Sequence, residues 1–141
     1  MSKLETPMTR WYWQQVGGTL VEEFCAVRRS PTCGVRLLDG VIIKGGEFRI
    51  AQQSEVRVEG QDIIVVQTKA ERLGMYLMGQ AFFSAQLMRK RFGPRMVESV
   101  ALVAQDDAVL RPLLEQYEGM RVVVCPPEVS GRQVRSPDNM Y

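Results

Sequence analysis

The chain has 141 residues, and its 18 basic and 16 acidic side chains give a formal net charge of +2. That length fits one domain and leaves no room for a second core of ordinary size, while 45% hydrophobic and 24% charged residues argue against a disordered or fibrous chain. Histidine is absent, which excludes His-based triads, His-ligated zinc and imidazole acid–base catalysis.

The first half of the chain indicates a short helix followed by strands that glycine-containing turns separate. Gly17 and Gly18 end the first helix, and β-branched residues favour a strand over 35–43. The expected elements are a leader over 1–8, a helix over 11–16, a segment over 19–27 that suits either a helical turn or a strand, a connection over 28–34, a strand over 35–43, a turn over 44–46 and one or two short strands within 47–59.

The second half alternates strands and helices. The unbroken apolar run Ile63–Val66 predicts that the strand over 62–69 is central and covered on both faces. Apolar residues spaced by three and four predict a long helix over 73–92. A strand over 97–104, a helix over 106–117 and a strand over 121–125 follow, so we expect a single domain over 1–127 and a disordered tail over 128–141. This order predicts an α/β fold, a mixed central sheet flanked by helices.

The cysteines and the apolar runs bear on location. Cys25, Cys33 and Cys125 are odd in number and form no CxxC pair, which indicates reduced thiols and no structural zinc. The first residues lack an apolar signal core, and the longest apolar runs are far too short to cross a bilayer. We therefore expect a cytoplasmic protein.

Three side chains within the expected strands suggest a site for chemistry. Asp39 lies in the 35–43 strand, and Gln67 and Lys69 end the 62–69 strand. Residues i and i+2 of a strand point to the same face, so Gln67 and Lys69 project together, beside whatever Asp39 presents from a neighbouring strand. An acid and an amide oxygen can bind Mg²⁺ or Mn²⁺, while a lysine positions water or stabilises charge on a phosphate.

This arrangement resembles the PD-(D/E)XK nuclease superfamily, which has the restriction-endonuclease-like fold. The resemblance rests on Asp39-Gly40-Val41-Ile42-Ile43, on the segment Ile63–Lys69 and on the element order from about Thr19 to Cys125. The usual glutamate of the E-x-K half-motif is Gln67 here, as in Mrr-type restriction enzymes and the TnsA-type transposase subunit. The resemblance implies a Mg²⁺- or Mn²⁺-dependent DNA endonuclease in which Asp39 and Gln67 hold the metal and Lys69 serves the nucleophilic water.

The same resemblance implies further residues. Nucleases of this kind usually add a glutamate from an upstream segment, and the sequence leaves both Glu22 and Glu23 open for that role. Recombination nucleases of the superfamily often carry a glutamine on the long helix, where this chain has Gln80; the tyrosine expected four residues later is Ser84.

Basic residues near the site are the candidates for contacts to the DNA backbone. Arg28, Arg29 and Arg36 are close to it in sequence, and the net charge of +2 predicts a modest electrostatic attraction. DNA is therefore the expected partner. The chain has no recognisable helix-turn-helix or zinc module, so a homodimer or a partner subunit could supply DNA recognition.

Two alternatives remain open at this point. The chain could be a non-catalytic DNA-binding or partner-binding module on the same fold, or an unrelated α/β interaction protein in which Q-x-K is accidental. Asp62 could replace Asp39 as the acid, but it opens its strand and is more typical of a turn. Met75, Met78 and Met88 are expected in the core rather than on a binding surface.

Overall fold

A computed structural model gives the structure of residues 1–131, and residues 132–141 lie outside the part described. Within that part, six strands form one mixed sheet in the order β3-β1-β2-β4-β5-β6. The helices are α1 (Glu5–Val16), α2 (Met75–Phe92), α3 (Leu110–Glu115) and α4 (Pro127–Ser130), and the strands are β1 (Thr19–Val27), β2 (Arg36–Ile43), β3 (Arg49–Ile50), β4 (Asp62–Arg72), β5 (Met96–Gln105) and β6 (Met120–Val124).

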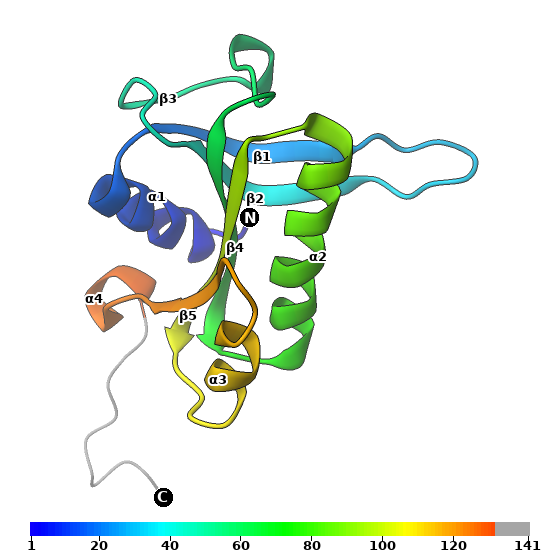
Figure 1. Ribbon diagram of the computed structural model, residues 1–141. Helices are drawn as coiled ribbons and strands as arrows, with labels where there is room; N and C mark the ends of the chain where they lie inside the picture. Colours follow the sequence, from blue (N-terminus) through cyan, green and yellow to red (C-terminus); the bar gives the residue numbers. More distant parts are fainter. Residues whose placement is uncertain (132–141) are drawn as a thin grey trace, which may run out of the picture.

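Strand β4 lies inside the sheet, with β2 antiparallel on one side and β5 parallel on the other. Its apolar residues alternate between the two faces: Ile63 and Val65 pack toward α2, and Ile64 and Val66 pack toward α1. Figure 1 shows α1 and α2 on opposite faces of this sheet. The predicted fold class is confirmed, and the apolar run of β4 has the expected cause, because both of its faces are covered.

Helix α1 docks on the sheet through a buried pair of hydroxyls. Thr9 Oγ1 lies 2.7 Å from Thr68 Oγ1 of β4, and both threonines are buried. The helix can approach this closely because Gly40 of β2 has no side chain: a Cβ there would lie 3.2 Å from Thr9 Cγ2. The contact places Thr9, in the second turn of α1, next to the point where β2 and β4 separate.

The structure corrects several expected boundaries. Helix α1 begins at Glu5 rather than at residue 11, because Met8 already packs with Tyr12 and Trp13 against the sheet. Residues 19–27 form a strand, and α3 is shorter than the predicted 106–117 helix because Asp107 turns the chain by accepting hydrogen bonds from the Val109 and Leu110 N–H groups.

The predicted tail is wrong at its start. Residues 128–130 belong to α4, which packs against α1, and the remainder of that tail lies outside the described residues. None of the helices in residues 1–131 is long and apolar enough to cross a membrane.

The hydroxyl pair gives the first testable prediction. Thr9→Val should lower the free energy of unfolding by about 1–3 kcal/mol, because it keeps the shape and leaves the Thr68 hydroxyl without its partner. Thr9→Val combined with Thr68→Val should recover much of that loss, since no buried hydroxyl is then orphaned. Urea denaturation of both single variants and the double variant measures the coupling. Additive losses would show that the pair does not hold α1 on the sheet.

Candidate functional site

Strands β2 and β4 separate where the candidate residues lie. Their ladder ends at the pair Gly40–Val66, and beyond it side chains take over the hydrogen bonds. Asp39 Oδ2 accepts a hydrogen bond from the Thr68 N–H at 2.8 Å, and Gln67 Oε1 accepts one from the Asp39 N–H at 3.4 Å. The structure thus brings Asp39 and Gln67 together in the gap between two diverging strands.

Glu23 lies directly opposite Asp39, because Glu22 of β1 pairs with Gly40 of β2 and Phe24 pairs with Leu38. The period-two alternation slips in both strands at this point: Val21 and Phe24 face α2, and so do Val41 and Leu38. Glu23 also has a φ of 50°, which is uncommon for a residue with a side chain; strained residues of this kind recur at active sites and ligand-binding sites. Because of this slip, the side chains of Glu23 and Asp39 belong to neither hydrophobic core.

The two candidate glutamates have different surroundings. Glu22 lies on the α1 side, where both of its carboxylate oxygens accept hydrogen bonds from Arg10, at 2.8 and 3.1 Å. Glu23 is exposed, and it receives the N-terminal ammonium of Met1. Of these two glutamates, only Glu23 is among the charges that act on Asp39.

The electrostatic surroundings of Asp39 disfavour its ionised form. Burial raises the pKa of its carboxyl from 3.8 to about 6, against the opposing effect of the Thr68 N–H. The negative charges of Glu5 and Glu23 raise that pKa further, and the N-terminal ammonium lowers it. Among residues 1–131, Asp39 Oδ1 accepts no hydrogen bond. Asp39 and Glu23 supply carboxylate oxygens of the kind that a divalent cation binds, but within residues 1–131 no third His, Cys, Asp or Glu side chain joins them as a metal-binding group.

Gln67 is almost completely buried, and hydrogen bonds fix both ends of its side-chain amide. Its Nε2 donates to Ser84 Oγ of α2 at 2.8 Å while its Oε1 accepts from the Asp39 N–H. Both ends of the amide are therefore used within the protein, and its oxygen would have to leave the Asp39 N–H to reach a metal. Ser84, the residue found where the resemblance expects a tyrosine, instead fixes the orientation of this amide.

Lys69 is exposed near the end of β4 and pairs in register with Val103 of β5. Val103 packs on the α2 side, and parallel partners share a face, so Lys69 and Gln67 are on the same side of the sheet as predicted. Lys69 has no carboxylate partner among the described residues.

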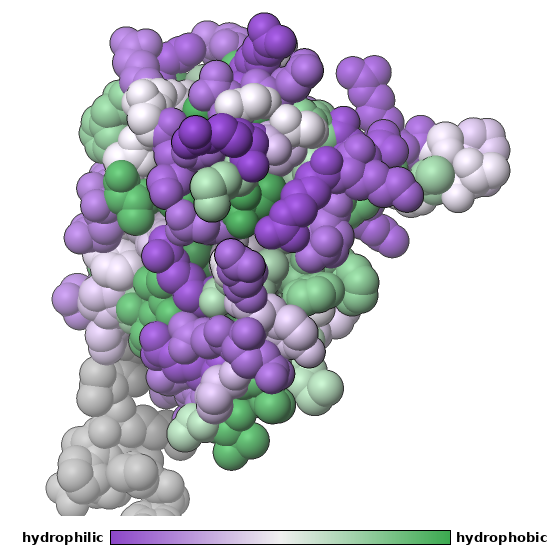
Figure 2. Space-filling model, in the orientation of Figure 1, coloured by the Kyte–Doolittle hydropathy of each residue, from purple (hydrophilic) through white to green (hydrophobic). Residues whose placement is uncertain are grey.

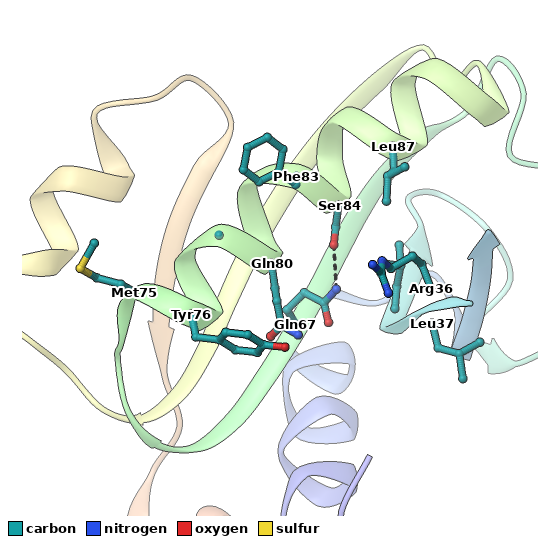
Figure 3. A pocket seen from close by; sticks show the side chains of 11 residues that line it. Arg36, Leu37, Gln67, Met75, Tyr76, Gln80, Phe83, Ser84 and Leu87 are labelled. Carbon is teal, nitrogen blue, oxygen red and sulfur yellow. Dashed lines mark hydrogen bonds between the residues drawn. The ribbon is translucent and has the colours of Figure 1, made fainter. Parts of the chain in front are cut away.

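A groove runs between α2 and the first residues of β2, with a volume of about 530 Å³ (Figure 3). We call it the α2–β2 groove. The residues that line it include Arg36 and Leu37 of β2, Gln67 of β4, and Tyr76, Gln80 and Phe83 of α2. Two of the predicted DNA-binding residues, Arg36 and Gln80, therefore lie beside Gln67.

The other two, Arg28 and Arg29, lie outside the groove in the hairpin connection between β1 and β2, which Figure 1 shows protruding from the body of the protein. Both are exposed, and neither has a carboxylate partner within residues 1–131.

Two further expectations are resolved by geometry. Asp62 lies at the start of β4 and binds Arg95, which lowers the pKa of its carboxyl, so it is apart from the site. Met88 is fully buried as expected, but Met75 is 75% exposed and lines the α2–β2 groove, so its assignment to the core is wrong. Helix α2 has more apolar residues than its buried side holds, so the three-to-four spacing alone did not show which of them are in the core.

No known protein family and no curated protein matches the chain. Among solved structures, the fold is similar to the crystal structure of a repair endonuclease from Pyrococcus abyssi, with a TM-score of 0.55 and 15% sequence identity. The similarity covers 90% of this chain and 48% of that one, so the chain spans about half the length of that endonuclease. At this identity the likeness shows a shared fold alone, and it agrees with the predicted mixed sheet flanked by helices.

Sequence reasoning missed the partners that build this site. The Thr68 N–H and the Ser84 hydroxyl hold Asp39 and Gln67, but an unremarkable residue of a Q-x-K motif and a serine on a helix carry no sequence signal. Glu23 rather than Glu22 lies near Asp39 because the backbone has a positive φ at Glu23. The sequence gives no sign of this conformation, since glutamate rarely adopts it.

The raised pKa predicts a pH-dependent cost of Asp39. Because the folded-state pKa is about 6 and the ordinary value is 3.8, the native state loses stability as the pH rises through that interval. Without metal, Asp39→Asn should therefore be more stable than wild type by up to about 3 kcal/mol at pH 8, and should show little gain near pH 4. Thermal unfolding in EDTA across this range tests the effect; a gain independent of pH would exclude ionisation as its cause.

Proposed function

We propose that the protein is a divalent-metal-dependent nuclease that hydrolyses phosphodiester bonds in DNA. The observation that carries the proposal is the gap between β2 and β4. There the half-buried carboxyl of Asp39 lies beside Gln67 and across from Glu23, and burial and neighbouring negative charges raise its pKa. The fold that the chain shares with a repair endonuclease supports it.

Each residue has a role that its surroundings suggest. Asp39 and Glu23 would hold Mg²⁺ or Mn²⁺ through carboxylate oxygens, and the metal, when bound, polarises the phosphate and lowers the pKa of a water. Gln67 would contribute its amide oxygen or orient Asp39 through the existing hydrogen bond. The ammonium of Lys69, on the same face as Gln67, would stabilise charge that develops on the phosphate or position the attacking water.

DNA would approach over the basic surface around the hairpin. Arg28 and Arg29 in the hairpin and Lys90 and Arg91 at the end of α2 have no carboxylate partner within residues 1–131, and Arg91 ties the two elements together by donating to the Ala26 carbonyl at 2.9 Å. Figure 2 shows hydrophilic side chains gathered over the upper part of the molecule, around the base of the hairpin. Unpaired cations of this kind suit phosphate contacts.

One observation favours a second candidate, a DNA-binding module without catalysis. Within residues 1–131, no three side chains of the His, Cys, Asp and Glu types come together as a metal-binding group. Gln67 replaces the acid that would complete such a group, and its amide is already engaged by Asp39 and Ser84. In this case the protein would bind DNA equally well with and without metal, and a partner subunit or a second copy would supply the active centre.

Metal binding separates the two candidates. We expect weak Mn²⁺ binding that Asp39→Ala abolishes and Glu23→Gln weakens, because each removes a carboxylate oxygen from the site. Glu22→Gln is the matched control and should not change the affinity, since Glu22 lies on the α1 side with Arg10 and is not among the charges that act on Asp39. At Glu23 the metal would displace the Met1 ammonium. Calorimetry or Mn²⁺-induced NMR line broadening measures the binding. Equal binding by wild type and Asp39→Ala would remove Asp39 as a ligand.

Cleavage is the sharper test. Lys69→Ala should reduce metal-dependent cleavage on the order of a hundredfold or more while leaving the fold intact, because the exposed lysine acts on the transition state rather than in packing. Gln67→Glu adds an acidic ligand and should retain activity or improve it at low Mg²⁺. Lys44→Ala, which removes a lysine paired with Glu98 away from the site, is the control. Full activity of Lys69→Ala would refute this role.

A further inference from the structure

The α2–β2 groove has a composition that the proposed metal chemistry does not use. Its floor is polar, with the Gln67–Ser84 hydrogen bond, and its α2 wall is hydrophobic at the surface. Tyr76 is 82% exposed and Phe83 is 65% exposed, although both are large rings on a helix that buries its opposite side in the core. Figure 3 shows Arg36 and Leu37 on one side of the groove and the side chains of α2 on the other.

The charge of the groove points to an anionic occupant. Arg36 is the charged residue among those that line it, no carboxylate lines it, and Arg36 forms no ion pair within the described residues. Its guanidinium makes only a local hydrogen bond to the Val35 carbonyl, at 3.2 Å. A phosphate can therefore be bound there without displacing a carboxylate.

Gly79 keeps the groove open at a cost to the helix. It lies in the interior of α2 and lines the groove, and a Cβ at this position would meet no atom within 4 Å. Glycine inside a helix is unfavourable relative to alanine by about 1 kcal/mol. Nothing in the packing of the described residues needs the missing side chain, so the space over Gly79 is available to something outside the chain.

We propose that the α2–β2 groove binds an unpaired stretch of DNA, with bases stacked on Tyr76 and Phe83 and a backbone phosphate at Arg36. The inference rests on the proposed function and adds the substrate class: single-stranded or branched DNA rather than a continuous duplex. Exposed aromatic rings next to a cation bind single strands through stacking, whereas the bases of a duplex already stack on one another. A volume of about 530 Å³ is large enough for a small-molecule ligand, and the groove adjoins Gln67 of the candidate site.

Binding without cleavage tests the inference separately from catalysis. Fluorescence anisotropy in EDTA would compare a labelled oligothymidylate with a blunt duplex of the same length. Tyr76→Ala and Phe83→Ala should each weaken binding of the single strand on the order of tenfold, because each removes a stacking surface. Duplex binding should change much less, and Tyr76→Phe should bind the single strand as wild type does.

Two further variants separate binding in the groove from loss of stability and from loss of an aromatic ring elsewhere. Gly79→Leu fills the groove from a position where the protein has open space, so it should raise the melting temperature and still weaken binding of the single strand. Tyr117→Ala removes another exposed aromatic, one that lines a neighbouring groove between α2 and α3, and should leave DNA binding unchanged.

The outcomes distinguish this inference from the proposed function. Unchanged single-strand binding in Tyr76→Ala, Phe83→Ala and Gly79→Leu would overturn the inference and leave the groove as a surface for a protein partner. If these variants still cleave duplex DNA with metal, the proposed function stands. A wild-type protein that binds neither the single strand nor the duplex would overturn both.

Discussion

The hydrogen bond from the Thr68 N–H to the Asp39 carboxylate is the interaction on which the rest of the site depends. Where β2 and β4 stop pairing, a sheet would normally leave backbone groups unsatisfied, and this structure uses Asp39 and Gln67 side chains instead. The separation of the strands and the position of the carboxylate are therefore one feature: the acid can be in the gap because it replaces the ladder there.

This solution leaves a net electrostatic cost. The Thr68 N–H offsets only part of the burial of Asp39, and Glu5 and Glu23 add like charge nearby. The positive φ of Glu23 adds backbone strain in the same place. A site selected for stability alone would place a neutral residue at position 39. Two carboxylates near one another at the end of a strand ladder, at a cost to stability, are the reason for the proposal that this gap binds a cation.

The sequence predicted those parts of the fold that follow from one periodic signal. The run Ile63–Val66 located the central strand, and with it the neighbourhood of Gln67 and Lys69. The strand over 19–27 was ambiguous for a reason now visible: both faces of its first half are buried and its alternation slips at Glu23, so neither a period of two nor one of 3.6 fits. Long-range partners such as Ser84 depend on how α2 lies across the sheet, which no local pattern encodes.

Helix α2 connects the two candidate surfaces. Through Ser84 it fixes the Gln67 amide beside Asp39, and through Tyr76 and Phe83 it presents aromatic rings to solvent along the same groove. The buried side of the helix explains its docking, and that docking accounts for Ala81, Ala85 and Met88. The exposed rings and the glycine between them have no such explanation from the core. Phe83 packs edge-on against Phe82 but remains 65% exposed, and Tyr76 and Gly79 contribute little to the core. These features are the reason for the proposal that the groove, which adjoins Gln67, binds a ligand.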